Sequence, residues 1–175
     1  MTYLRTMDIY KIMKNRRSTR SFSATAISDK ILQRVLSAGT YAPSGANQKP
    51  YAYVMVKDPV LKEQIRTQCE RVDQAHYQKS PEWFKDWMDS KHISLTKSFL
   101  TDAPCLVVII GESNKPYWLE STWLSIAYIL LAAEQESLVT LTYTPAEIDF
   151  LYDILSIPAV FKPVVILPIG YPKKP

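Results

Sequence analysis

The densest group of residues able to bind an anion lies near the start of the chain, in the run Arg16-Arg17-Ser18-Thr19-Arg20. Three arginines within five residues, next to a serine, can hold a phosphate through forked, charge-assisted hydrogen bonds. The alternative is a solvated basic turn after a helix, where positive charge also suits the helix C-terminus. Arg16, Arg17, Ser18 and Arg20 are therefore candidate phosphate ligands, and the residue types alone leave both interpretations open.

A second polar group lies in Pro43-Ser44-Gly45-Ala46-Asn47-Gln48, whose composition indicates a loop. Gly45 allows close backbone approach, while Ser44, Asn47 and Gln48 offer side-chain hydrogen bonds to a polar ligand. An ordinary turn has the same composition, so the pattern alone does not choose between a ligand loop and a turn.

Alternating threonines in Thr140-Leu141-Thr142-Tyr143-Thr144 form a third group. At the end of a strand such hydroxyls can face a ligand. Threonine also favours strands, however, and Thr144 is equally explained as a helix cap.

Hydrophobic periodicity predicts the elements that must position these groups. Helices are expected over 7–14, from Ser28-Asp29, after Asp58-Pro59, over 118–136, and from the capping box Thr144-Pro145-Ala146-Glu147; strands are expected over 51–56, 105–110, 138–143 and 164–169. The polar and aromatic stretch 71–98 predicts two short surface helices that form a lid. The order of elements indicates one α+β domain over residues 1–175, built around a single sheet.

Composition narrows the classes of function. The chain has 175 residues, of which 47% are hydrophobic, enough for one folded core. Its formal charge of +4 suits an anionic small molecule, and no basic stretch is dense enough to predict nucleic-acid binding. The two cysteines and two histidines match no zinc spacing, so we expect no metal site. No secretion signal and no apolar run of ~20 residues is found, which predicts a cytoplasmic protein that does not bind membranes.

The arginine run and the string Ala42-Pro43-Ser44-Gly45-Ala46-Asn47-Gln48-Lys49-Pro50 resemble the opening of nitroreductase-superfamily proteins, and Leu167-Pro168-Ile169-Gly170-Tyr171-Pro172 resembles their final strand. The resemblance spans nearly the whole chain in the right order. It implies a nitroreductase-like α+β fold with a mixed, mainly antiparallel sheet flanked by helices, and FMN bound at a homodimer interface.

The same resemblance implies roles for individual residues. Arg16, Arg17, Ser18 and Arg20 would hold the phosphate and the polar edge of the flavin, and Pro43, Ser44 and Asn47 would line the cofactor, partly from the partner subunit. Family members continue into an arm that adds a basic phosphate contact, which Lys173 or Lys174 is expected to supply here. The backbone N–H of Ala46 would bind a phenolate oxygen of the substrate.

The stretch 125–145 is similar to the iodotyrosine deiodinase branch of that superfamily. In that branch a threonine just before a proline hydrogen-bonds flavin N5, which implies a catalytic role for Thr144, with Thr142 beside the cofactor. The branch grips the amino-acid end of its substrate with a glutamate, a tyrosine and a lysine, whose positions fall on Asp73, Tyr77 and Lys97. The alternative is that Asp73 and Tyr77 are an i,i+4 pair on a solvated helix, with Lys97 a surface charge.

The implied activity is that of an FMN-dependent oxidoreductase. NAD(P)H would reduce FMN, and the flavin would then reduce a small aromatic acceptor: a nitroaromatic, a quinone, or a halogenated phenol such as a halotyrosine. Two alternatives are an FMN- or aromatic-ligand-binding module with little turnover, and a flavin-fragmenting enzyme.

Overall fold

The sheet is built around the apolar run predicted at 105–110, which forms strand β2 (Cys105–Glu112) in the computed structural model describing residues 8–173. The strand order is β1-β2-β4-β3, with β1 at Tyr51–Val56, β4 at Phe161–Gly170 and β3 at Val139–Thr140. All three strand pairs are antiparallel, and an isolated bridge between Ser18 and Thr140 adds a parallel contact at the edge. The predicted, mainly antiparallel sheet is therefore confirmed.

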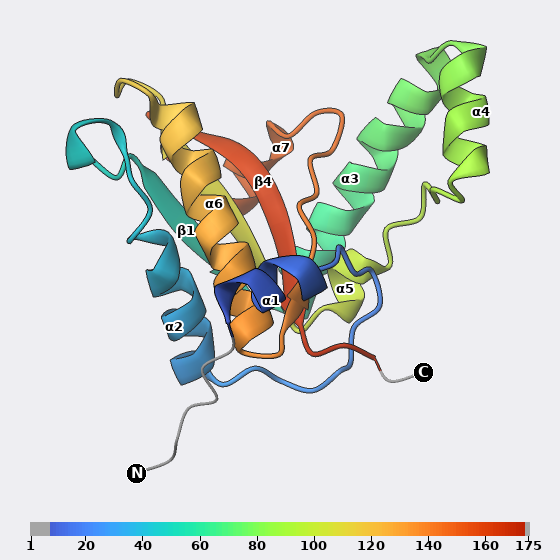
Figure 1. Ribbon diagram of the computed structural model, residues 1–175. Helices are drawn as coiled ribbons and strands as arrows, with labels where there is room; N and C mark the ends of the chain where they lie inside the picture. The colour runs from blue at the N-terminus through green and yellow to red at the C-terminus, as the bar shows by residue number, and fades with distance from the viewer. Residues whose placement is uncertain (1–7, 174–175) are drawn as a thin grey trace.

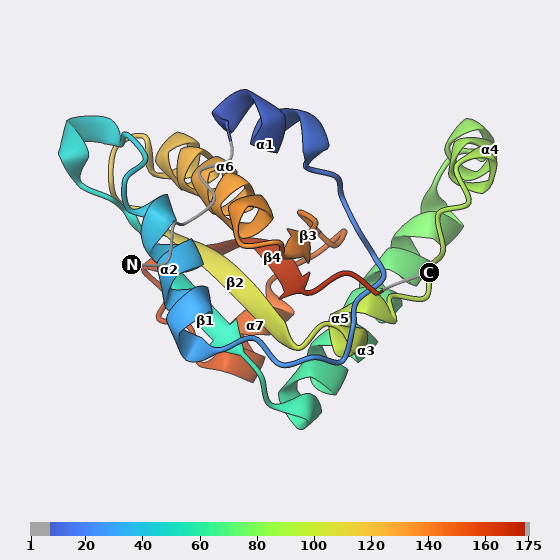
Figure 2. The same cartoon turned by 60° about the horizontal axis from the view of Figure 1, so that its bottom comes forward.

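Helices cover both faces of this sheet (Figures 1 and 2), because alternate residues of β2 point to opposite sides. Leu106, Val108 and Ile110 pack with α3 (Pro59–Lys79), α5 (Phe99–Asp102) and α7 (Phe150–Leu155). Cys105, Val107 and Ile109 pack with α2 (Asp29–Gly39) and α6 (Trp118–Gln135). A strand buried on both faces needs apolar residues at every position, which explains the unbroken run.

Side-chain caps start the helices where the sequence predicted them. The Oγ of Ser28 accepts the N–H of Ile31 at 3.4 Å at the start of α2. Asp58 Oδ1 accepts the N–H groups of Val60 and Leu61 at 2.8 and 2.9 Å, and Pro59 occupies the first position of α3. The helix predicted at 7–14 is α1 (Ile9–Asn15).

The stretch 71–98 differs from the prediction of two short helices. Its first part continues α3, which runs for 21 residues to Lys79, and only α4 (Glu82–Ser90) is a separate short helix. The buried stripe Ile65, Cys69 and Val72 continues at helical spacing, and no proline interrupts it before Pro81. The end of α3 and α4 form a helical arm that projects from the sheet (Figure 1, green).

The prediction of a helix that begins at Thr144 is also wrong. The chain there forms another isolated bridge, Tyr143 to Ile166, and the next helix begins at Phe150. The N–H of Ala146, which a helix cap would have used, is instead donated to Asp73 on α3. The strand predicted at 138–143 is correspondingly reduced to Val139–Thr140.

Candidate functional site

A cavity of about 260 Å³ lies between the helical arm and the sheet, and four of the predicted site residues line it. These are Asp73, Tyr77, Lys97 and Thr144. The remaining lining residues are mostly apolar or aromatic: His76, Phe84, Trp87, Met88, Ile93, Leu95 and Ala146. A small apolar cavity with a few convergent polar groups is typical of a site for an aromatic ligand.

Three segments, distant in sequence, position these four residues. Asp73 and Tyr77 lie four residues apart on α3 and therefore face the same side of the helix. Lys97 comes just before α5 and is buried, and Thr144 follows the bridge between Tyr143 and β4. Helix α4 adds an aromatic wall, in which the Phe84 and Trp87 rings lie 5.8 Å apart. The trio predicted to grip an amino-acid group thus shares one cavity with the threonine predicted to contact the flavin.

The carboxylate of Asp73 is already held by groups of the protein. Its Oδ2 accepts the hydroxyl of Tyr143 at 2.8 Å and lies 3.2 Å from Lys97 Nζ, and its Oδ1 accepts the N–H of Ala146 at 3.0 Å. Lys97 Nζ also donates to the carbonyl of Ser94 at 2.8 Å. Burial, followed by the neighbouring Cys69 and Asp73, raises the pKa of Tyr143, so its hydroxyl stays protonated and acts as a donor to the carboxylate.

Lys97 is fixed at its backbone as well as at its ammonium. Its N–H donates to Glu70 Oε1 at 2.7 Å, and the same oxygen accepts Arg66 Nε at 2.8 Å. Burial alone would raise the pKa of Glu70, but the hydrogen bonds from Arg66 and Lys97 outweigh it and lower that pKa below its usual value. Sequence reasoning missed Glu70 and Tyr143, because their partners lie 27 and 70 residues away; the only visible signal was the i,i+4 spacing of Arg66 and Glu70.

Residues 16–20, called here the arginine segment, lie along the edge of the sheet beside strand β3. The N–H of Thr19 donates to the carbonyl of Thr140 at 3.2 Å, within the parallel bridge from Ser18. Further along, the N–H of Lys173 donates to the carbonyl of Ser21 at 3.4 Å, so the C-terminal segment runs beside the same stretch. Arg16 is half-buried, whereas the side chains of Arg17, Ser18 and Thr142 are exposed. Lys174 lies outside the described residues.

A second cavity, of about 450 Å³, lies between the arginine segment and the stretch that follows α4. Arg20, Lys97 and Tyr143 line it, together with 91–94 and three further residues before and within α5. Ile93 and Lys97 also line the smaller cavity, so the two spaces are neighbours. A ligand whose polar edge meets Arg20 therefore lies close to one held by Lys97.

The loop 43–48 has an unusual backbone. Ala46, Asn47 and Lys49 adopt left-handed φ values of 50°, 55° and 48°, which are uncommon for residues other than glycine. The loop forms a short 3-10 turn, η1 (Gly45–Asn47), and the N–H of Gly45 donates to Ser121 Oγ on α6 at 3.3 Å. Backbone strain of this kind gathers at functional sites, which supports a ligand role for the loop.

An apolar surface lies on α6 and α1, and the start of α6 is bonded to that loop through Ser121. On α6 the side chains of Leu119, Trp123, Leu124 and Tyr128 are 40–45% exposed, and on α1 those of Ile9, Tyr10 and Met13 are 45–77% exposed. The two helices pack together. Only one face of α6 is buried, and these side chains lie on the other. Exposed apolar side chains gathered on two packed helices are typical of an interaction surface.

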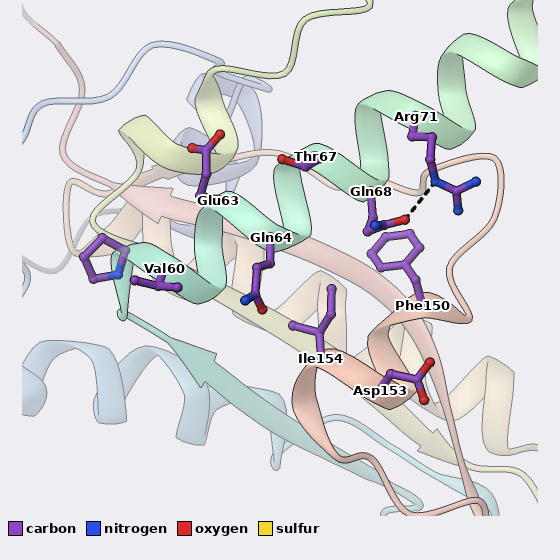
Figure 3. A pocket seen from close by; sticks show the side chains of 10 residues that line it. Val60, Glu63, Gln64, Thr67, Gln68, Arg71, Phe150, Asp153 and Ile154 are labelled. Carbon is purple, nitrogen blue, oxygen red and sulfur yellow. Dashed lines mark hydrogen bonds between the residues drawn. The ribbon is translucent and has the colours of Figure 1, made fainter.

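The groove drawn in Figure 3 is larger, about 800 Å³, but contains none of the predicted site residues. It lies between α3 and α7, with Val60, Phe150 and Ile154 among its apolar residues. At its edge, Arg71 Nε donates a hydrogen bond of 2.9 Å to Gln68 Oε1.

Within residues 8–173, no three His, Cys, Asp or Glu side chains gather as metal ligands would. In the same range, no helix is both long and apolar enough to span a bilayer.

The chain is similar in sequence and in fold to known proteins. Residues 13–171 match the sequence model of the nitroreductase family. The iodotyrosine deiodinase of Thermotoga neapolitana is 35% identical over 167 residues, 95% of this chain and 90% of that protein. That of Haliscomenobacter hydrossis is 33% identical over 177 residues, 94% of this chain and 79% of that protein. The crystal structure of an oxidized iodotyrosine deiodinase bound to FMN and 3-iodo-L-tyrosine superposes with a TM-score of 0.92 at 35% identity, covering 96% of this chain and 91% of that one.

Proposed function

Because this chain belongs to the nitroreductase family, we propose that it is an FMN-dependent oxidoreductase that reduces small aromatic acceptors, with reductive dehalogenation of a halotyrosine as its leading reaction. The observation that carries the proposal is the meeting of Asp73, Tyr77, Lys97 and Thr144 around one aromatic-walled cavity. The similar solved deiodinase, bound to FMN and 3-iodo-L-tyrosine, supports both the cofactor and the substrate class.

The residues present fit FMN. Arg16, Arg17 and Arg20 offer forked cationic donors, and Ser18 a hydroxyl, along one exposed edge of the sheet, where a phosphate and a polar ring edge can be bound without burying an unpaired charge. Lys173 runs beside the same segment and is a further candidate for the phosphate. Thr142 and Thr144 follow the neighbouring strand β3, with exposed side chains. Bound FMN would supply the redox chemistry, and Thr144 would donate a hydrogen bond toward its N5.

The cofactor site is completed by a second copy of this chain. In Figures 1 and 2 the arginine segment, the blue stretch after α1, and the cyan loop 43–48 lie on opposite sides of the molecule. We therefore propose that the two segments that contact one FMN come from two chains. The exposed apolar side chains of α6 lie next to the loop and would be covered in such a homodimer. Pro43, Ser44 and Asn47 would then line the partner's flavin.

The cavity residues suit an aromatic acceptor stacked near the flavin. Phe84 and Trp87 offer an aromatic wall, Lys97 has a free donor for a carboxylate after its bonds to Asp73 and Ser94, and Tyr77 can orient the polar end. The backbone N–H of Ala46 from the partner is the candidate donor to a phenolate oxygen. Closure of the arm over the ligand would exclude water and strengthen these contacts.

The proposed reaction balances with two electrons and one proton. The carbon–halogen bond is replaced by a carbon–hydrogen bond, halide leaves, and the electrons come from NAD(P)H through the cofactor. Stopped-flow mixing with NADH and with NADPH tests the donor, because a ligand-binding module with little turnover would leave the flavin oxidised.

Ligand binding tests the acceptor. Halotyrosines should quench the flavin fluorescence at far lower concentration than the matching halophenols, which lack the amino-acid end, and halide should be released during turnover. Equal affinity for the two ligand series, with reduction of nitroaromatics or quinones alone, would leave a general nitroreductase and remove the deiodinase-type assignment.

A further inference from the structure

We infer that Asp73 is a positioning residue that fastens the turn around Thr144 to the helical arm, so that the position of the arm sets the position of the threonine hydroxyl. This inference rests on the proposed role of Thr144 toward the flavin. It concerns this chain's own carboxylate, which stands where the similar deiodinase branch is expected to have a glutamate.

The contacts of Asp73 bracket Thr144. The hydroxyl of Tyr143, the residue before Thr144, donates to Oδ2 at 2.8 Å, and the N–H of Ala146, two residues after it, donates to Oδ1 at 3.0 Å. Both oxygens of one carboxylate thus hold the two sides of a single short turn. Thr144 belongs to no helix or strand of its own. The backbone of Tyr143 before it is bonded to Ile166 of β4, and the two bonds to Asp73 connect the same turn to α3.

The same carboxylate connects the turn to Lys97. Oδ2 lies 3.2 Å from Lys97 Nζ, and the side chains of Asp73 and Lys97 are 15% and 7% exposed. The backbone of Lys97 is held separately by Glu70, one helical turn earlier on α3. Asp73 and Glu70 therefore join one helix, the segment before α5 and the Thr144 turn into one unit.

This arrangement limits what Asp73 can do for a ligand. A substrate ammonium that took the carboxylate for itself would have to displace Lys97 or the hydroxyl of Tyr143, and would leave a buried donor unpaired. The geometry therefore favours a carboxylate that stays bonded to Tyr143 and Ala146 while the ligand is bound. Its effect on the reaction is then exerted through Thr144.

Tyr143→Phe tests this directly, because it removes one bond of the bracket and keeps the ring. Loss of this charge-assisted bond should raise the rate of hydrogen exchange in the segment 143–147 by about 10- to 100-fold. The midpoint potential of bound FMN should shift in the same direction as in Thr144→Ala, and Tyr143→Phe should add nothing in the Thr144→Ala background. Tyr152→Phe is the matched control, since its hydroxyl donates to the carbonyl of Phe161 at 2.9 Å, and it should leave the potential unchanged.

A second experiment distinguishes a positioning role of Asp73 from direct binding of the substrate ammonium. Asp73→Ala and Tyr143→Phe should change the affinity for a halotyrosine and for its des-amino analogue, an aryl propionate, by the same factor. The inference is overturned if Asp73→Ala lowers the affinity for the halotyrosine alone, while hydrogen exchange in 143–147 and the FMN potential stay at wild-type values in both Asp73→Ala and Tyr143→Phe. Asp73 would then be an ammonium ligand. Exchange and potential are measured without any acceptor, so they still decide the inference if the protein proves not to dehalogenate.

Discussion

The arginine segment and the loop 43–48 are both short, polar and exposed, yet the fold holds them in different ways. The first runs along the sheet edge. The backbone of Thr19 is bonded to Thr140 of β3, and that of Ser21 to Lys173 in the C-terminal segment. The second contains two left-handed residues, Ala46 and Asn47, with a third, Lys49, directly after it, and its Gly45 is bonded to α6. The first segment belongs to the chain's own sheet, whereas the second lies beside an apolar surface that its own chain leaves uncovered.

From this difference we propose that the cofactor site is divided between two chains. The arginine segment carries the charge and shares a cavity with Lys97 of the same chain. The loop has left-handed backbone at Ala46 and Asn47 and is the proposed donor of an N–H group to a ligand of the other chain. Substitutions in the two regions should therefore have different effects. Loss of the arginines should weaken FMN binding in a protein that still forms a dimer, whereas a charge in the apolar α6 surface beside the loop should prevent the dimer from forming.

The largest expected effect is on FMN affinity in the variant Arg16→Ala, Arg20→Ala. Each arginine removed loses a charge-assisted hydrogen bond worth roughly 1.5–3 kcal/mol, so FMN should bind about 10²–10⁴-fold more weakly. Equilibrium titration of the apoprotein with FMN measures this, and sedimentation should still give the wild-type assembly. Arg34→Ala on α2 serves as a charge control. Unchanged FMN affinity in the double variant would falsify the assignment of the arginine segment.

Leu124→Glu on α6 should break the assembly instead. Its side chain is 45% exposed in the single chain, so the substitution leaves the monomer core intact but puts a charge into the apolar surface. We expect wild-type protein to sediment as a dimer at micromolar concentration, and the variant as a folded monomer that binds FMN poorly. Lys30→Glu, at an exposed site on α2, is the matched control. A monomer that keeps tightly bound FMN would contradict the division of the site.

Mixed dimers test the comparison most directly. A chain with Arg16→Ala and Arg20→Ala, combined with a chain carrying Asn47→Ala, gives one site with both defects and one with neither. If the two regions serve the same flavin from different chains, the mixed dimer should recover up to half of the wild-type FMN content at high affinity. If both regions serve the flavin of their own chain, every site in the mixed dimer is defective and no such recovery occurs.

The smallest effect is expected at Gly45. A Cβ there would lie 3.0 Å from Tyr117 Cδ2 and 3.3 Å from the carbonyl oxygen of Pro116, and the exposed Tyr117 ring can move aside. Gly45→Ala should therefore cost only about 1 kcal/mol of stability, within the usual range for overpacking. Ala46→Gly should be neutral or stabilising, because glycine tolerates the left-handed φ of 50°. Thermal unfolding of the two variants measures both changes in stability. A greater loss of stability in Ala46→Gly than in Gly45→Ala would mean that the loop backbone is not strained.

Local chemistry made much of this protein predictable. The continuous apolar run of β2, the caps Ser28 and Asp58, and the strand at Tyr51–Val56 follow from side-chain periodicity and hydrogen-bonding capacity within a few residues. The arginine run and the loop 43–48 were recognisable for the same reason, since their composition differs from that of their neighbours.

Tertiary contacts decided the rest. The sequence of Thr144-Pro145-Ala146-Glu147 is a good helix start, but a bond from Ala146 to Asp73, 73 positions away, replaces the cap. Likewise, the apolar residues of α6 look the same in sequence whether they face the sheet or solvent, and only the packing against α2 and the sheet leaves one set exposed. Residue type and near-neighbour spacing determine where helices and strands can form and which side chains can bind phosphate. Which carboxylate meets which donor, and which apolar face stays uncovered, depends on long-range packing, because those partners have no fixed separation along the chain.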